Sequence, residues 1–399
     1  MGNSDHPLAP AQSLARVLTF WPLVFYGLGV IVGAGIYVAL GTVIGRAGDA
    51  APFSFLLAGI AAGLTGLCYA ELASRFPEAA GAASYVQKGF RSDRLAQLTG
   101  AALTIAVAVS AASIARGAVH YLTILVPVSQ NLLTAALVGG FTAIAVIGVW
   151  ESVGLAALLG VIEIGGLVIA TIVGFQAAPS LDFRGLVPMD SAAWHGVIAG
   201  AFIAFFAFIG FETLANLAEE VRDAQRTVPR AMLGALAASM VLYIAVASAA
   251  VLSDKTGGLP LLDLFEGKGA TIFAGLAFLA VSNGVLIEIV MLARLFYGMA
   301  RNGQLPASLG HVYQRTRTPV LATLTAGMIV LVVALLVPFE RLLVFANALT
   351  LFLFALVDLA LWRIKFRRPV PRADFEVWSW VPPAASVLTT LLILAEVLQ

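Results

Sequence analysis

Residues 29–41 read GVIVGAGIYVALG, an apolar stretch with Gly33-Ala34-Gly35 near its middle. A glycine in a helix interior costs about 1 kcal/mol relative to alanine, so such a cluster favours local unwinding. The other interpretation is a helix-packing face, because Gly29 and Gly33 stand four residues apart. Either way, the stretch predicts a membrane helix with an unusual backbone at its centre.

This stretch lies in the first of eleven apolar runs. A helix that crosses about 30 Å of hydrocarbon needs about 20 residues. Strict apolar–polar alternation is absent, and lipid tolerates no unpaired backbone, so we expect helices. The expected spans are 21–46, 51–74, 95–125, 131–149, 152–176, 195–218, 229–252, 270–299, 318–338, 341–363 and 378–397.

The composition supports the same class. Of the 399 residues, 60% are hydrophobic and 11% charged, with a mean hydropathy of +0.97. Soluble domains are about 45–50% apolar and about 25% charged. The sequence therefore predicts an all-α integral membrane protein whose partner is the lipid bilayer. The net charge of +1 offers no basic field for a nucleic acid, so no such partner is expected.

No cluster of catalytic or metal-binding residues is visible. The four histidines lack metal-ligand spacing; they are His6, His120, His195 and His311. No phosphate-binding Gly-x-x-x-x-Gly-Lys-Ser/Thr loop is present. We therefore expect no metal, no cofactor and no enzyme. A membrane-embedded enzyme and a channel or receptor remain as rival classes.

The basic residues predict the orientation. With the N-terminus in the cytoplasm, the inner flanks of the spans hold 16 lysines and arginines and the outer flanks hold 5. Cytoplasmic loops carry the excess of such residues. We expect a multi-pass protein of the cell membrane with a cytoplasmic N-terminus. The odd number of spans then puts the C-terminus outside the cytoplasm.

The sixth run has its own interruption signal. Residues 205–212 read FFAFIGFE, which places Gly210 and Glu212 near the midpoint of the run. Interrupted spans at matching positions of two halves mark the central site of many transporters. The first and sixth runs match in this way if the chain is a five-plus-five inverted repeat.

Four motifs resemble the amino acid–polyamine–organocation (APC) superfamily. They are GVIVGAGIYVALG (29–41), ELASRFPEAAGAASYV (71–86), FFAFIGFETLANLAEEVRDAQRTVPRA (205–231) and ARLFYGMARNGQLP (293–306). Each is similar to the family pattern at its topological position. Together they identify the chain as a member of this family of amino acid permeases.

The resemblance implies a LeuT-like fold with a discontinuous first and sixth helix. It divides the chain into a cytoplasmic segment (1–20), a first repeat (21–176), a second repeat (195–363) and an additional helix (378–397). Many relatives have twelve spans rather than eleven, but the extra helices lie outside the repeats. Substrate is expected midway between the repeats.

An amino acid brings a carboxylate and an ammonium group. Free amides at a broken helix end suit the carboxylate, and the amides of Gly33, Ala34 and Gly35 are the candidates. Freed carbonyls suit the ammonium group. The candidates for this role are Ile31, Phe206 and Ile209, beside Gly210 in the second break. The resemblance also implies that Phe206 lines or gates the pocket, although ordinary packing would explain it too.

Glu163 stands near the middle of the fifth run, in LLGVIEIGGLVI (158–169). Relatives in several branches carry a lysine at this position. A carboxylate at mid-membrane is costly unless it is protonated, paired or hydrated, so it is a functional hypothesis by default. Glu163 could carry a coupled proton, attract a cation, or form a structural hydrogen bond to the unwound first helix.

Three more charged residues fall within spans. Glu212 aligns with an acidic position that relatives use in gating. Glu288, near mid-depth in the eighth run, could face the pocket and favour cationic substrates, or pair with Arg116. Arg116 could instead meet Glu212 or extend outward to the membrane surface.

The sequence thus predicts a secondary active transporter of amino acids that works by alternating access. Protons are the expected coupling partner, because a titratable carboxyl replaces the lysine of relatives. The alternative is an exchanger of amino acids or polyamines without net proton coupling. The substrate's side chain and the oligomeric state stay open.

Overall fold

The computed structural model describes residues 18–77, 81–147, 153–254, 259–313, 316, 318–367 and 372–398. Of the segment 1–20 that was expected in the cytoplasm, residues 1–17 lie outside the described part. Within the described part the chain is helical, and extended pairing is confined to two isolated bridges, Leu18 with Val221 and Tyr313 with Thr318.

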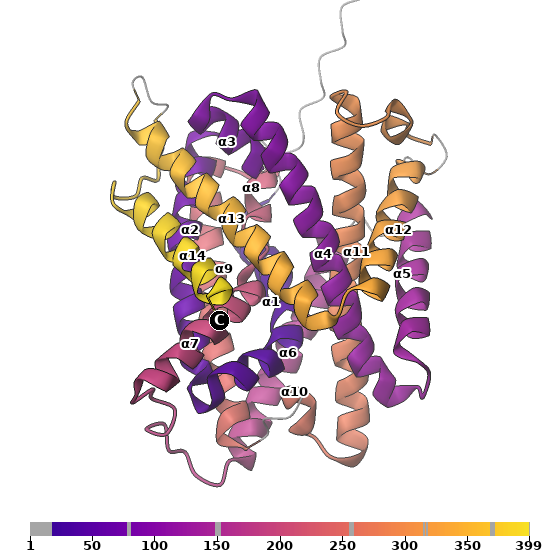
Figure 1. Ribbon diagram of the computed structural model, residues 1–399, viewed down its shortest axis with the longest axis vertical. Coiled ribbons are helices and arrows are strands. Elements are labelled where there is room, and N and C mark those ends of the chain that lie inside the picture. Colours follow the sequence, from indigo (N-terminus) through magenta and orange to yellow (C-terminus); the bar gives the residue numbers. More distant parts are fainter. Residues whose placement is uncertain are drawn as a thin grey trace, which may run out of the picture.

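The long helices form a bundle (Figure 1). They are α1 (Phe20–Ala47), α2 (Ala51–Arg75), α4 (Asp93–Leu125), α5 (Gln130–Ile147), α6 (Val153–Ala177), α7 (Ser191–Ala204), α9 (Ala224–Leu252), α11 (Gly267–Arg301), α12 (Val320–Leu336), α13 (Phe339–Lys365) and α14 (Val381–Val397). Shorter elements connect them: α3 (Ala82–Phe90), α8 (Thr213–Asn216), α10 (Pro260–Asp263), η1 (Gly48–Ala50), η2 (Phe205–Phe208), η3 (Ala218–Glu220) and η4 (Ala307–Gly310).

The described helices make this a multi-pass membrane protein. Eight helical stretches are long and apolar enough to cross a membrane, and three shorter apolar helices accompany them. Each of the eleven expected runs coincides with helix in the structure. The sequence scan missed α3 and α10, because neither is long or apolar enough to resemble a span. These two short helices lie at opposite ends of the bundle (Figure 1).

Local signals account for several helix ends. Ser92 accepts a hydrogen bond from the Leu95 amide at the start of α4, and Asp190 accepts one from Ala193 at the start of α7. Such caps satisfy amides that have no partner inside the helix. Proline occupies the first turn of α2 and of α14, where its missing N–H is harmless.

Two long helical segments in the interior of the bundle are interrupted. In α1 the backbone leaves helical geometry at Gly33, with φ −34° and ψ −121°. The sixth run, expected as a discontinuous helix, consists of α7, η2, an extended residue at Ile209 and then α8. Gly210 follows with φ +119°, in a region that side-chain-bearing residues rarely adopt.

The packing brings the two interruptions together. Helix α1 packs against α6, α7, η2 and α9, and α4 packs against α11 and α13. The segments around the interruptions are deeply buried: Ile31 is 1% exposed and Phe206 is 4% exposed. Helices α5 and α12 lie side by side at the edge of the bundle, away from this region (Figure 1).

Candidate functional site

A cavity of about 140 Å³ lies between both interruptions and the helices α4, α6, α11 and α13. One water needs roughly 10–15 Å³ by this measure, so the space holds a small organic molecule. Seven of the eleven predicted site residues line the cavity: Gly33, Glu163, Phe206, Ile209, Gly210, Glu212 and Glu288. Ile31, Gly35 and Arg116 do not line it. Ala34 belongs to α1, but its side chain lies outside the described part of the chain.

The break in α1 faces Glu163. A Cβ atom at Gly33 would lie 3.6 Å from Glu163 Oε2, so the α6 carboxyl group reaches the point where α1 leaves helical geometry. The Glu163 side chain is 1% exposed. Neither carboxyl oxygen has a well-formed hydrogen bond with the described residues, although Asn283 of α11 lies near enough to interact with the group. Glu163 is thus a buried carboxyl in the wall of the cavity, beside the break in α1.

Tyr243 of α9 joins the two interrupted segments. Its hydroxyl lies 2.8 Å from the Ile31 carbonyl of α1 and 2.8 Å from the Ala207 carbonyl of η2. The predicted role of the Ile31 carbonyl as a substrate acceptor thus competes with a protein donor. Tyr243 is fully buried, and the sequence offered no signal that linked it to these carbonyls.

Gly35 of α1 packs closely against the backbone of η2. A Cβ at this position would come within 2.5 Å of the Ala207 Cα atom. The glycine lets α1 and η2 approach backbone to backbone, as small residues do between membrane helices. The predicted contact of its amide with substrate stays a prediction.

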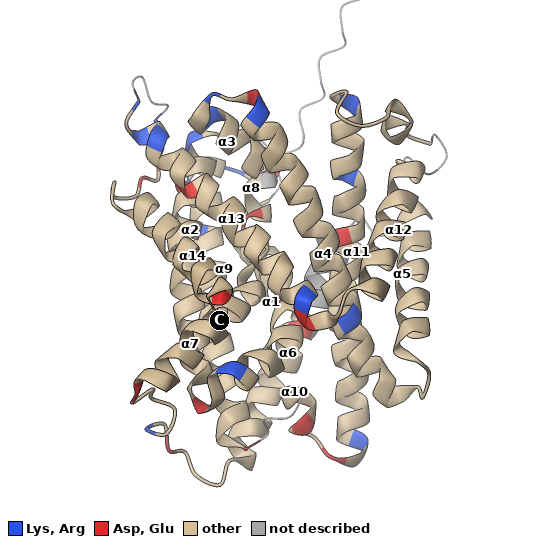
Figure 2. Cartoon of the chain, viewed as in Figure 1, with Lys and Arg blue, Asp and Glu red and all other residues tan. Residues whose placement is uncertain are grey.

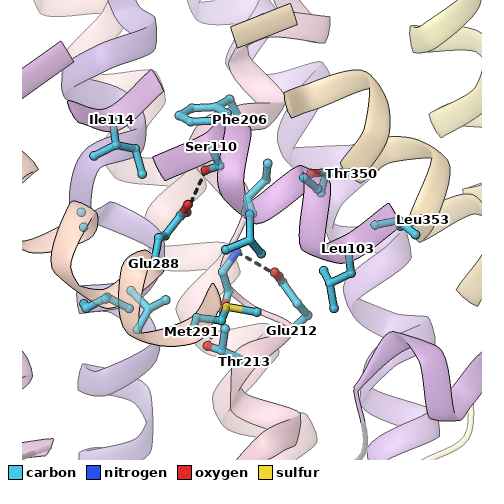
Figure 3. A pocket seen from close by; sticks show the side chains of 18 of the residues that line it. Leu103, Ser110, Ile114, Phe206, Glu212, Thr213, Glu288, Met291, Thr350 and Leu353 are labelled. Atoms are coloured by element: carbon cyan, nitrogen blue, oxygen red, sulfur yellow. Dashed lines mark hydrogen bonds between the residues drawn. The ribbon is translucent and has the colours of Figure 1, made fainter. Parts of the chain in front are cut away.

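The break in the sixth run is closed by its own residues. The Gly210 amide donates to Glu212 Oε2 at 2.9 Å, and the Thr213 hydroxyl donates to the Gly210 carbonyl at 2.7 Å. Figure 3 shows Glu212 and Thr213 at one end of the cavity, with Phe206 at the other. The second break therefore presents a carboxyl group to the cavity in addition to backbone groups.

Glu288 projects from α11 toward α4. Its Oε1 atom accepts a hydrogen bond of 2.7 Å from the Ser110 hydroxyl (Figure 3). Arg116 pairs with neither Glu288 nor Glu212: its Nη1 atom donates to Asn131 Oδ1 of α5 at 2.9 Å. The Arg116 side chain is therefore directed away from Glu288 and Glu212, toward α5.

The lining of the cavity is acidic. Glu163, Glu212 and Glu288 all border it, and no lysine, arginine or histidine is among the lining residues that the structure describes. The amide of Asn283 and the hydroxyl groups of side chains such as Ser110 supply uncharged hydrogen-bonding groups. Positive charge suits such a cavity better than negative charge, because carboxylates in a low dielectric need a cationic partner.

The cavity extends toward one end of the bundle. Gly81 and Ala82, at the start of α3, belong to its lining. On the opposite side an aromatic layer separates it from α10. The Tyr121 hydroxyl donates to the Tyr37 carbonyl at 2.8 Å, and the rings of Tyr37, Phe273 and Phe265 are in contact. The cavity therefore extends toward α3.

Sequence reasoning missed several polar residues of the cavity. Ser110, Asn283 and Thr350 come from three helices that carry no break and no recognised motif at these positions. Their one common signal is a polar side chain at mid-depth of an apolar run. Many such side chains hydrogen-bond their own helix, as Thr350 does with the Ala346 carbonyl, so this signal does not single out a site.

Comparison with known proteins bears on the site as a whole. The family model for amino acid permeases matches residues 18–398. Cationic amino acid transporter 3, mitochondrial, of Arabidopsis thaliana is 29% identical over 90% of this chain and 64% of its own length. The methylthioribose transporter of Bacillus subtilis (strain 168) is 31% identical, over 92% of this chain and 85% of the relative.

A third relative is named for a different class of substrate. The branched-chain amino acid permease BcaP of Bacillus subtilis (strain 168) is 25% identical over 91% of this chain and 84% of its own length. The chain spans less than two thirds of the plant relatives, covering 58% of cationic amino acid transporter 9, chloroplastic, of Arabidopsis thaliana.

Proposed function

This chain belongs to the amino acid permease family, and on that premise we propose that it is a secondary active transporter of amino acids. The observation that carries the proposal is one cavity bordered by two interrupted helices. Broken helices expose amides and carbonyls at mid-membrane, where they replace the water that a zwitterion loses. The Gly33 segment is the proposed carboxylate site, and Phe206 and Ile209 are the proposed acceptors for the ammonium group.

The proposed architecture is the LeuT-like inverted repeat. Helices within 21–176 form the first half, those within 195–363 the second, and α14 is additional. The position of the interruptions supports this division, because each falls in the first long segment of its half. Alternating access then takes place as one group of helices moves against the other around the cavity.

The distribution of charge supports the proposed orientation. Lysines and arginines gather at the end of the bundle that carries α3 (Figure 2). This end includes the last turns of α11 and α13, with Arg301, Arg363 and Lys365. Such an excess is typical of the cytoplasmic side. The cavity extends toward this end, so the structure corresponds to an inward-facing form in the proposed orientation.

Glu163 is the proposed coupling group. A carboxyl that is 1% exposed and lacks a cationic partner is costly to ionise, so an approaching substrate charge changes its tendency to hold a proton. Its contact with the Gly33 break would pass that change to the moving helix. Uptake and protonation would thereby become linked.

A ligand screen tests transport itself. All amino acids and the common polyamines would be added to the purified protein, and a ligand that binds the native state raises the melting temperature with its concentration. Ligands found in this way would then be tested for uptake into liposomes. Absence of stabilisation and uptake for every compound contradicts the proposed function.

The variant Glu163→Gln tests the coupling. In wild-type liposomes we expect an inward proton gradient to accelerate uptake, and in the variant this acceleration should be lost while exchange of substrate across the membrane persists. Glu266→Gln, an exposed position beside α11, is the matched control. Acid-stimulated uptake by Glu163→Gln equal to wild type rules out this role, and wild-type exchange without any gradient effect supports an exchanger instead.

A further inference from the structure

Glu288 is the cavity carboxyl that neither break uses. Its Oε1 atom is held by the Ser110 hydroxyl at 2.7 Å. Its Oε2 atom is buried and has no hydrogen-bond partner among the described residues. Buried polar atoms in folded proteins almost always have a partner, so an orphaned oxygen beside a cavity points to a missing one.

Among the described residues, none that lines the cavity supplies a positive charge to Glu288. Arg116, one and a half turns beyond Ser110 on α4, bonds Asn131 instead. The charged group near enough to act on Glu288 is a second carboxyl, that of Glu212. Two carboxyls that face one cavity without a basic residue repel each other when both are ionised. A cationic group that arrives with the ligand would stabilise them.

The position of Glu288 separates it from the groups proposed to bind the α-carbon of the substrate. Figure 3 shows it on the α11 wall, directed toward Ser110, with Ile114 beside them and the Glu212 carboxyl elsewhere in the cavity. Gly33 and Ile209, from the two breaks, line the same space. A ligand seated at the breaks can thus extend a chain to Glu288 without leaving the cavity.

We propose that Glu288, oriented by Ser110, is a subsite for a second cationic group on the substrate. The ligand is then an amino acid or amine that carries an ammonium or guanidinium group away from its α-carbon. This proposal rests on the proposed transport function and names the substrate class of that same site. The soft terminal torsion of glutamate allows either oxygen to turn toward the ligand.

A purely structural role would be a polar link that fastens α4 to α11. Glu288→Gln separates the two roles, because glutamine keeps the size of the side chain and its hydrogen bond with Ser110 but removes the charge. A structural link would leave selectivity among substrates unchanged. A charge-recognition subsite would lose selectivity while the fold stays intact.

The experiment compares wild type, Glu288→Gln, Ser110→Ala and the control Glu266→Gln by calorimetry and by uptake into liposomes. Lysine and arginine, each with a second cationic group besides the α-ammonium group, are called the dicationic probes; alanine and leucine, which lack that second group, are the neutral ones. We expect Glu288→Gln to weaken lysine or arginine binding at least about thirtyfold, the scale of a lost buried ion pair. Neutral probes should bind as in wild type or more tightly. Ser110→Ala should weaken the dicationic probes only a few-fold.

Three outcomes overturn the subsite. An unchanged ratio of dicationic to neutral affinity in Glu288→Gln contradicts it, and so does a wild-type protein that binds neutral probes alone; in both cases transport stands. A wild-type protein that binds no amino acid or amine refutes the proposed function together with the subsite. If Glu288→Gln fails to fold, Glu288→Asp replaces it, with a loss of affinity confined to lysine and arginine as the supporting result.

Discussion

The two helix interruptions differ in how the chain builds them. In α1 a single residue, Gly33, leaves helical geometry and the helix continues at once. In the sixth span the helix stops at Phe208, Ile209 is extended, Gly210 has a positive φ, and α8 begins only at Thr213. One interruption is a kink and the other is a true gap.

The two interruptions also differ in the groups that lie against their backbone. The gap is closed locally, since Gly210 donates to Glu212 and accepts from Thr213. The kink faces a carboxyl from another helix, Glu163, at 3.6 Å from the position of a Cβ atom on Gly33. The second interruption thus carries its own hydrogen-bond partners, whereas the first lies beside an unpaired carboxyl group of α6. A change in the charge of a neighbouring group should therefore act on the first more than on the second.

Gly210→Ala should have the largest effect, because the backbone of the gap has a positive φ at this residue, which a residue with a side chain rarely adopts. A Cβ at φ +119° is strained, and it would also come within 2.8 Å of Val30 Cγ1. We expect a loss of about 2–4 kcal/mol of stability, measured as a fall in the melting temperature in detergent, and loss of uptake. Gly298→Ala, where an added Cβ meets no atom within 4 Å, is the control. A stable, active Gly210→Ala protein would show that the gap is not fixed by this glycine.

Glu212 allows the local closure to be tested separately from charge. Glu212→Gln keeps an oxygen that can accept from the Gly210 amide, whereas Glu212→Ala leaves this amide without its side-chain acceptor. We expect the alanine variant to be less stable than the glutamine variant by about 1 kcal/mol, the net value of one hydrogen bond. The melting temperatures of the two variants give this difference. Equal stability would mean that the carboxyl does not hold the gap together.

The existence of both interruptions could be predicted from sequence, and their difference could not. Clustered glycines near Gly33 and a glycine and a carboxylate at 210 and 212 marked the two sites in otherwise apolar runs. Composition and run length likewise predicted eleven helices that the structure contains. These features are local, because helix propensity and span length depend on neighbouring residues.

The contacts across the site lay beyond sequence reasoning for a physical reason. Tyr243 reaches Ile31 across 212 positions of the chain, and Ser110 reaches Glu288 across 178. Such pairs depend on how helices rotate about their axes, which the hydropathy of a buried helix does not fix. The same limit explains why the close packing of Gly35 against Ala207 was not predicted.

Gly33→Ala should have the smallest effect on stability and sharpens the comparison most. It is the same substitution as Gly210→Ala, made in the other interruption, where a Cβ meets only Glu163 Oε2 at the ordinary contact distance of 3.6 Å. We expect the melting temperature to change little, because φ at Gly33 is negative and the added Cβ meets one atom at an ordinary contact distance. The added methyl group, however, stands between the kink and the carboxyl. Substrate affinity by calorimetry and the gradient effect on uptake should both fall several-fold. If Gly33→Ala instead unfolds the protein as readily as Gly210→Ala, the kink is as rigidly built as the gap, and its proposed dependence on Glu163 is wrong.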